Sequence, residues 1–93
     1  MIRRVELSRL AQRQLRKVPA YIVRKLLAWV ESVERDGLEE VRKIPGFHDE
    51  PLQGDRRGQR SIRLSIAYRA IYEIRKDGLV EFASVEEVSK HDY

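Results

Sequence analysis

The spacing of apolar residues divides the chain into two halves with different periods. A short alternating segment at residues 3–7 predicts a strand, and apolar residues then recur every three to four positions, as in amphipathic helices. Two helical stripes are present, formed by Leu7, Leu10, Ala11, Leu15 and Val18 and by Ile22, Val23, Leu26, Leu27, Val30 and Val33. The first half is therefore expected to be a short strand followed by a two-helix hairpin.

Residues with strong preferences for helix ends mark the boundaries of these helices. Ser8 is a suitable N-cap for the first helix, and Pro19 interrupts that helix and suits the first turn of the second. Gly37 predicts the end of the second helix, because glycine readily adopts the backbone conformation that follows a helix C-terminus. A further short helical turn is expected over residues 38–43.

The second half alternates with a period of two and is rich in β-branched and aromatic residues, a pattern typical of strands. Three segments show it, with the sequences "QRSIRLS", "YRAIYEI" and "LVEFASVEEV". The chain is therefore expected to form a single α+β domain over residues 1–93. Its predicted parts are the short N-terminal strand, the two-helix hairpin and an antiparallel sheet of three further strands.

The last hairpin is predicted from which side chains must share a face, because a slip of one residue exchanges the two faces. A three-residue loop at residues 76–78 places Tyr72 and Ile74 on the same face as Val80 and Phe82. A two-residue loop at residues 77–78 would instead place a glutamate on that face. The three-residue loop is expected because it gives a coherent apolar core.

The preceding hairpin is treated in the same way, and a loop at residues 65–67 puts the apolar positions on the core side. Arg63 then lies opposite Arg69 on the other face. Like charges directly opposed across strands are destabilising, by about 0.2–1 kcal/mol. An anion bound between the two arginines is one explanation for such a pair, and two long side chains that extend into water are the other.

Charge and composition narrow the classes of function. The net charge is +4, and residues 53–76 hold seven basic and two acidic side chains, which indicates either a polyanionic partner or a solvated basic surface. Cysteine is absent, so disulfides and thiolate metal sites are excluded. No apolar run approaches the roughly 20 residues of a membrane span. The protein is expected to be soluble and cytoplasmic, with no membrane partner.

Motifs in the second half resemble those of a known group of proteins. The segments "EPLQGDRRGQRSIRL" and "YRAIYEI" and the terminal "HDY" resemble the RelE/ParE superfamily of bacterial type II toxins. The resemblance is closest to the ribosome-dependent mRNA interferases of the YoeB and HigB branches. It covers most of the chain and is specific from Glu50 to Tyr93, whereas the helical half matches in layout only.

The resemblance implies an activity and its partners. Toxins of these branches cut mRNA in the ribosomal A site through attack of a ribose 2′-hydroxyl on the adjacent phosphate. That reaction needs a base, cationic donors at the phosphate and an acid for the leaving oxygen, and it requires no metal or other cofactor. The implied partners are the 70S ribosome, mRNA and a cognate antitoxin, which forms a hetero-oligomer with the toxin.

The resemblance also implies roles for particular residues. It assigns the base to Glu50, the phosphate contact to Arg69, and roles near the leaving group to His91 and Tyr93. The surrounding cations Arg56, Arg57, Arg60 and Arg63 are expected to bind RNA phosphates, and His48 and Asp92 are further catalytic candidates. For Glu50, the alternative is a loop carboxylate that pairs with Arg56 or Arg57.

The tail departs from the YoeB pattern, in which the histidine and the tyrosine are adjacent. Asp92 separates His91 from Tyr93 here, so either His91 or His48 is the expected acid. Two other functions stay open from the sequence. One is a ParE-like inhibitor of DNA gyrase that acts by protein binding, and the other is a nonenzymatic nucleic-acid-binding module.

Overall fold

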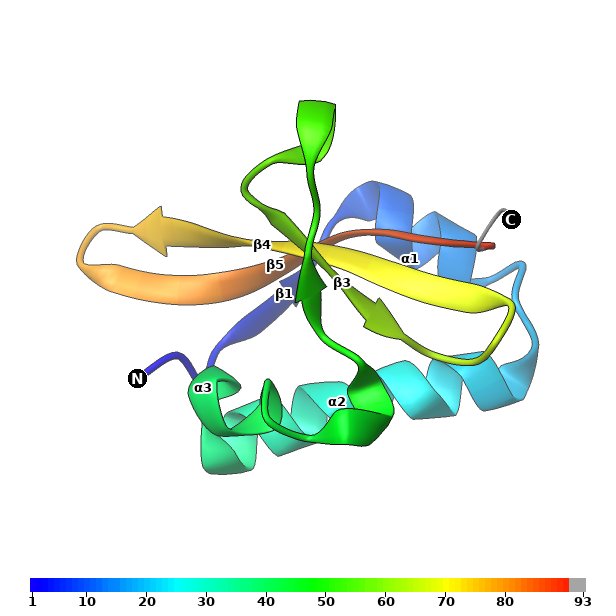
Figure 1. Ribbon diagram of the computed structural model, residues 1–93, viewed down its shortest axis with the longest axis horizontal. Helices are drawn as coiled ribbons and strands as arrows, with labels where there is room; N and C mark the ends of the chain where they lie inside the picture. The colour runs from blue at the N-terminus through cyan, green and yellow to red at the C-terminus, as the bar shows by residue number, and fades with distance from the viewer. Residues whose placement is uncertain (91–93) are drawn as a thin grey trace.

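A computed structural model describes residues 1–90, which form a five-stranded sheet with helices packed on one face (Figure 1). The elements in chain order are β1 (Val5–Leu7), α1 (Arg9–Leu15), α2 (Ala20–Asp36), α3 (Leu38–Val41), the 3₁₀ helix η1 (Pro45–Phe47), β2 (Glu50–Pro51), the 3₁₀ helix η2 (Gly54–Arg56), β3 (Gln59–Arg63), β4 (Tyr68–Asp77) and β5 (Val80–Lys90). The predicted α+β class is confirmed, and β2 is a strand that the sequence did not predict.

The order of strands in the sheet is β1-β5-β4-β3-β2. The N-terminal strand β1 runs parallel to β5, and all other neighbouring pairs are antiparallel. The first and last described strands are therefore neighbours, and the short strand β2 forms the opposite edge. This arrangement matters for function because β2 belongs to the stretch between α3 and β3, residues 42–58, which we call the irregular segment.

The predicted helix caps are present, with one shift. The Ser8 hydroxyl accepts a hydrogen bond from the amide of Ala11 at 3.0 Å and donates one to the carbonyl of Glu86 in β5 at 2.7 Å. Gly37 ends α2 with φ of +89°, as expected for a glycine stop. Pro19 is the N-cap of α2 rather than part of its first turn, so the helix begins one residue later than expected.

We expect Ser8→Ala to lower the free energy of unfolding by about 1–2 kcal/mol, because it removes both the helix cap and the link to β5. Thermal or urea unfolding followed by circular dichroism measures this. The matched control is Ser32→Ala, since the Ser32 hydroxyl donates only to the carbonyl of Ala28 within the same helix. The control should change stability by about 0.5 kcal/mol or less. Equal losses in the two variants would contradict the capping role.

The core lies between the helices and one face of the sheet. It comprises Ala11 of α1, Ile22, Leu26, Trp29 and Val33 of α2, Ile62, Ala70, Tyr72, Ala83, Val85 and Val88 of the sheet, and Leu64 directly after β3, with further buried side chains from the N-terminal segment, α3 and η1. Trp29 was missing from the predicted stripe, yet it is fully buried with its ring centroid 5.1 Å from that of Tyr72. Leu10 and Leu27 belonged to the stripes but are 42% and 46% exposed.

The predicted register of β3 and β4 is confirmed. Ile62 pairs with Ala70 and Arg63 pairs with Arg69. The amides of Leu64 and Ser65 both donate to the carbonyl of Tyr68, which closes the turn. The two arginines therefore lie opposite each other on the face of the sheet that the helices do not cover, which we call the open face. It carries Ser61, Arg63, Arg69, Ile71, Glu73, Ser84 and Glu87.

The predicted loop of the β4–β5 hairpin is wrong. Asp77 pairs with Val80, so the loop contains only Gly78 and Leu79, with Gly78 at a φ of +63°. The physical reason is a β-bulge: Ile71 pairs with Glu87 whereas Tyr72 pairs with Val85, so Glu86 is an extra residue in β5. A bulge reverses the alternation of faces, and a prediction based on a constant period of two cannot include it.

The consequence of the shorter loop is a different set of core residues in β5. Ile74 pairs with Ala83 on the core face, whereas Phe82 lies on the open face beneath the Arg4 guanidinium, 4.5 Å from its ring centroid. Val80, expected in the core, is 53% exposed. The predicted grouping of Tyr72 and Ile74 with Val80 and Phe82 is therefore replaced by a grouping with Ala83 and Val85.

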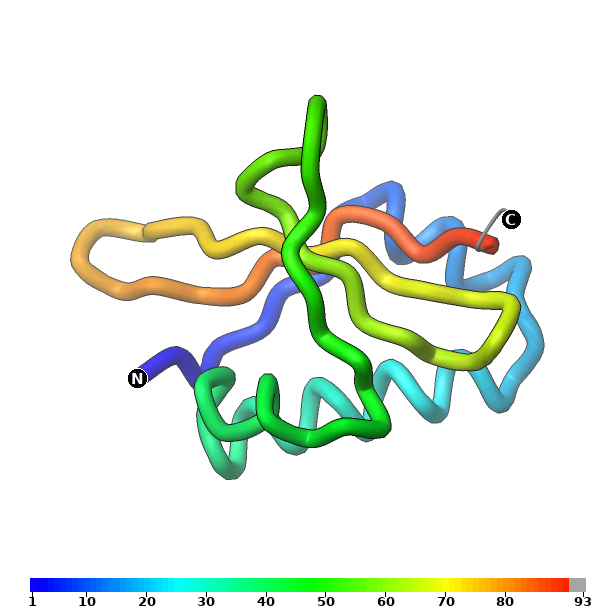
Figure 2. The backbone as a smooth tube through the Cα atoms, in the orientation of Figure 1, coloured from blue at the N-terminus to red at the C-terminus, as the bar shows by residue number. Residues whose placement is uncertain are grey.

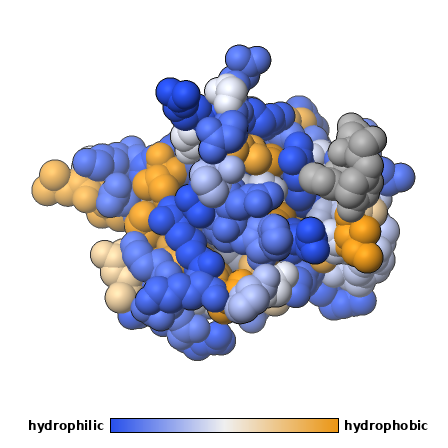
Figure 3. Space-filling view, viewed as in Figure 1, coloured by the Kyte–Doolittle hydropathy of each residue, from blue (hydrophilic) through white to orange (hydrophobic). Residues whose placement is uncertain are grey.

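The β4–β5 hairpin extends well beyond its neighbouring strands (Figure 2). Leu79 at its tip is fully exposed, and apolar side chains gather at this end of an otherwise mainly hydrophilic face (Figure 3). Within residues 1–90, no helix has the length and apolar character needed to cross a membrane.

Candidate active site

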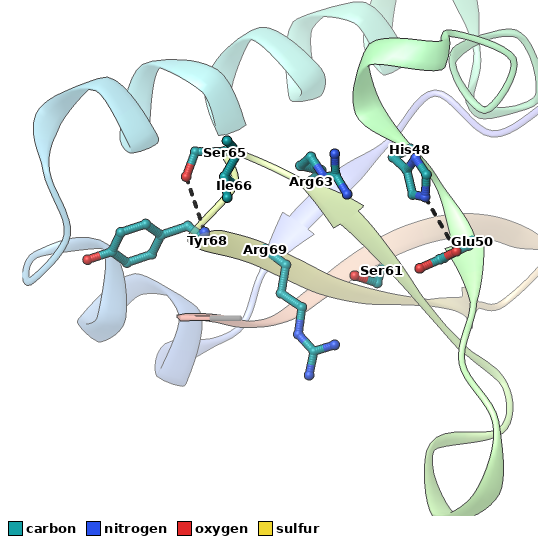
Figure 4. Close-up of a pocket in the computed structure, with 8 residues that line it drawn as sticks. All are labelled: His48, Glu50, Ser61, Arg63, Ser65, Ile66, Tyr68 and Arg69. Atoms are coloured by element: carbon teal, nitrogen blue, oxygen red, sulfur yellow. Dashed lines mark hydrogen bonds and ion pairs between the residues drawn. The ribbon is translucent and has the colours of Figure 1, made fainter. Parts of the chain in front are cut away.

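A small pocket of about 70 Å³ lies where the open face of the sheet meets the edge strand β2 (Figure 4). Three sources supply its lining. The segment before and within β2 provides His48 and Glu50, strands β3 and β4 provide Ser61, Arg63, Tyr68 and Arg69, and the β3–β4 turn provides Ser65 and Ile66. The pocket therefore contains a carboxylate, an imidazole and two guanidinium groups.

Strand pairing brings the carboxylate to this pocket. Glu50 pairs with Ser61 across β2 and β3, which fixes its backbone beside the open face. Its Oε2 atom lies 3.6 Å from Nε2 of His48, and both side chains are more than half exposed. His48 has φ of +48°, a left-handed conformation that is uncommon for residues other than glycine. That backbone turn directs the chain from η1 into β2 and allows the two side chains to meet.

The two opposed arginines supply the positive charge, and they differ in burial. Arg63 is exposed, whereas Arg69 is half-buried. The Nε atom of Arg69 is buried and has no hydrogen-bond partner within residues 1–90. Buried polar groups without partners are rare in folded proteins, and a guanidinium in this condition is suited to an anionic ligand. The pocket of Figure 4 is thus bordered by the two arginines and by the Glu50–His48 pair.

The other three arginines named from the sequence do not line this pocket. The Arg56 guanidinium binds the carboxylate of Glu87 at 3.1 Å and the side chain of Gln59, which holds η2 over the open face. Arg57 is exposed. The Nε atom of Arg60 donates to Oδ1 of Asp49 at 2.6 Å, on the core side of the sheet. The alternative pairing of Glu50 with Arg56 or Arg57 is not what the structure contains, since Glu50 contacts His48.

Several lining residues were absent from the sequence prediction. Ser61, Ser65 and Tyr68 border the pocket, and only the motif "YRAIY" gave a signal for the last of these. Asp49 was also missed, although its carboxylate is fully buried beside the pocket wall. Nothing in the local sequence distinguishes it from an ordinary loop aspartate.

The predicted roles of His91, Asp92 and Tyr93 fall outside the described residues. The last described residue, Lys90, pairs with Tyr68 of the pocket lining. Within residues 1–90, no group of three or more His, Cys, Asp or Glu side chains is arranged to hold a metal ion.

Solved structures of bacterial toxins share this fold. The YoeB/ParE toxin from Agrobacterium tumefaciens aligns with a TM-score of 0.69 at 19% identity, over 96% of this chain and 99% of that one. The DinJ-YafQ toxin-antitoxin complex from E. coli gives 0.67 at 21% identity, over 97% and 94%. The toxin-antitoxin complex RelBE2 from Mycobacterium tuberculosis gives 0.58 at 24%, over 95% and 96%. These similarities define the fold of the chain, which is that of the three toxins compared.

The sequence gives the family directly. The model of the family described as "ParE toxin of type II toxin-antitoxin system, parDE" matches residues 5–90. The chain therefore belongs to this family and is a type II toxin of the RelE/ParE superfamily. The comparison with curated proteins gives no match.

Proposed function

We propose that this toxin is a metal-independent endoribonuclease that cuts mRNA on the ribosome. The observation that carries the proposal is the convergence of Glu50, His48, Arg63 and Arg69 on one pocket of the open face. A gyrase inhibitor that acts by protein binding needs no such group of a base, an imidazole and unpaired cations. The resemblance of residues 50–93 to the YoeB and HigB branches supports the same activity.

The proposed chemistry assigns one task to each group. Glu50 removes the proton of the ribose 2′-hydroxyl, and the 2′-oxygen attacks the adjacent phosphorus. Arg69 and Arg63 stabilise the charge that develops on the phosphate oxygens, which is where preorganised cationic donors contribute most. The bond to the 5′-oxygen breaks as that oxygen receives a proton, leaving a 2′,3′-cyclic phosphate and a 5′-hydroxyl. The acid is His91 or His48, and Tyr93 orients the RNA.

The experiment that tests this function is cleavage of mRNA on programmed ribosomes, mapped by primer extension. Codon-positioned cuts that appear without added metal support the proposal. The match to the ParE family favours one competing activity, inhibition of DNA gyrase. Gyrase-dependent DNA breaks with intact mRNA would replace the proposed function by that one. Intact mRNA and intact DNA together would point to a nonenzymatic binding module.

The tail gives a separate prediction, supported by the position of Lys90 opposite Tyr68 at the pocket. Deletion of residues 91–93 should leave a folded protein that still binds ribosomes but cuts at least about tenfold more slowly, since a positioned acid contributes strongly to rate. Among single variants, His91→Ala should be slowest, Tyr93→Ala intermediate and Asp92→Ala near wild type. Single-turnover cleavage measures the ranking.

A different ranking would reassign the acid. If His91→Ala cuts normally while Asp92→Ala and His48→Ala are slow, the acid is His48, and the site resembles that of HigB-like toxins, which have a further histidine upstream of the tail. Unchanged cleavage after deletion of the whole tail would exclude all three terminal residues from the reaction.

We further propose that a cognate antitoxin neutralises the toxin by shielding this pocket. The DinJ-YafQ and RelBE2 structures are toxin-antitoxin complexes of proteins with the same fold. An anionic antitoxin segment over Arg63 and Arg69 would compete directly with RNA. A toxin-antitoxin structure in which both arginines and the tail stay exposed would contradict this mode of inhibition.

A further inference from the structure

A polar network on the core side of the sheet has no role in the chemistry proposed above. Its centre is Asp49, whose side chain is fully buried. Oδ1 of Asp49 accepts a hydrogen bond from Nε of Arg60 at 2.6 Å, and Oδ2 accepts one from the hydroxyl of Tyr72 at 2.5 Å. Nε of Arg42 donates to the same hydroxyl at 3.4 Å. We call Asp49, Arg60 and Tyr72 the Asp49 clamp.

The clamp connects the irregular segment beside the pocket to strands β3 and β4 of the sheet. Tyr72 is fully buried in β4 against Trp29, and Arg60 lies in β3 opposite Tyr72. Asp49 lies between His48 and Glu50, which are the two residues that the irregular segment contributes to the pocket. Charge-assisted hydrogen bonds to both oxygens of one buried carboxylate fix its position strongly.

The segment depends on such a connection because its regular structure is short. The strand β2 has only two residues, and His48, two residues before it, adopts a left-handed conformation. Such strained conformations persist only where surrounding contacts impose them. Side chains alternate along extended backbone, so holding Asp49 toward the core turns Glu50 toward the open face.

The pKa shifts of Tyr72 and Arg60 are consistent with their roles as hydrogen-bond donors to Asp49. Burial, together with the hydrogen bond to Asp49, raises the pKa of the Tyr72 hydroxyl well above its ordinary value, so this group stays a donor. Burial lowers the pKa of Arg60, but the hydrogen bond and the charge of Asp49 outweigh this effect and leave it raised. The carboxylate therefore keeps both of its donors at any pH at which a cell lives.

We infer that Asp49 is a positioning residue, which through Arg60 and Tyr72 holds Glu50 and His48 in their places at the pocket. The inference rests on the proposed function for its catalytic consequence, but the clamp itself can be measured without activity. The inference also assigns Arg60 to the clamp, whereas the sequence alone predicted that Arg60 binds RNA phosphates.

The variant of choice is Tyr72→Phe. It removes one donor to Asp49 and keeps the ring that packs on Trp29, whereas loss of the buried carboxylate itself would leave the partly buried Arg60 without its partner. We expect the single-turnover cleavage rate at saturating toxin to fall about 10- to 100-fold, since a displacement of about 1 Å at a reacting group costs up to that much. The toxin concentration for half-maximal rate should stay within about twofold, because the RNA-binding cations are untouched.

Arg60 provides the second pair of variants. Arg60→Lys retains a cation beside Asp49 and should keep more of the cleavage rate than Arg60→Gln. Neither should change the half-saturating concentration or its salt dependence. If Arg60 instead contacts a phosphate, Arg60→Gln will weaken ribosome binding and reduce the salt slope, and the clamp assignment of Arg60 is then overturned.

Hydrogen exchange tests the clamp without reference to activity. The amides of His48 and Leu52 are hydrogen-bonded at the two ends of the segment, and the amide of Ala83 is hydrogen-bonded to Arg4 in the body of the sheet. In Tyr72→Phe, exchange of the first two should accelerate at least about tenfold and that of Ala83 should change little, as expected for local opening. The control is Tyr21→Phe, the same substitution at an exposed site on α2, which should alter neither measurement.

The outcomes separate the clamp from the proposed function. Uniform acceleration of exchange in Tyr72→Phe would make the network a core stabiliser and overturn the inference. Local acceleration with normal cleavage would overturn the catalytic consequence. If the wild-type toxin cuts no RNA, the proposed function fails together with that consequence, and local acceleration then supports the clamp as a holder of the segment alone.

Discussion

Replacement of Arg69 by alanine is expected to abolish most of the cleavage activity and leave the fold intact. Arg69 lines the pocket, and its buried Nε atom is satisfied by no other group in residues 1–90. Loss of a cationic donor at a developing phosphorane lowers the rate on the order of 10²- to 10³-fold. The substitution also removes an unfavourable opposition to Arg63, which offsets the packing lost with the aliphatic stem. Stability should therefore change by about 0.5 kcal/mol or less.

Single-turnover cleavage on programmed ribosomes and thermal unfolding together measure this expectation. The matched control is Arg75→Ala, on the same strand and the same face, because Arg75 is paired with Glu86 at 3.1 Å and lies outside the pocket. The control should cut RNA at close to the wild-type rate. An Arg69→Ala variant that folds and cuts normally would remove Arg69 from the active site.

Glu50→Gln is expected to have the largest effect of all, a loss of cleavage on the order of 10³-fold. The amide keeps the size and the polarity of the side chain but cannot take a proton from the 2′-hydroxyl. More than half of the Glu50 side chain is exposed and its backbone pairing with Ser61 is unaffected, so the fold should be preserved. Ribosome binding should be equal or slightly tighter, because one negative charge is removed near the phosphate.

The control for this substitution is Glu81→Gln, an exposed glutamate near the tip of the β4–β5 hairpin. It changes the net charge by the same amount and should leave cleavage unchanged. If Glu50→Gln retains at least half of the wild-type rate, the base is another group, and His48 is the next candidate within the described pocket. Cleavage measured across a range of pH in that variant would then identify it.

Part of this structure can be predicted from the sequence, because some of its features depend only on residues that are close together in the chain. The cap at Ser8 and the stop at Gly37 depend on neighbouring backbone atoms, so they could be predicted. The β3–β4 register was predictable too, because one loop parity alone puts the apolar side chains of both strands in the core. That parity placed Arg63 opposite Arg69, and these two arginines line the pocket.

The rest required the tertiary structure, because it depends on groups far apart in the chain. The bulge at Glu86 decides which residues of β5 face the core, and a bulge has no signature in a run of alternating residues. Pairing of β2 with β3 brings Glu50 and His48 to the arginines. The carboxylate of Asp49 selects Arg60 from a cluster of similar arginines, since within residues 1–90 that guanidinium alone pairs with the buried oxygen. The sequence by itself thus determined the fold class and the opposition of Arg63 and Arg69 on the open face. Long-range pairing of strands decided which other charged side chains join these arginines at the pocket.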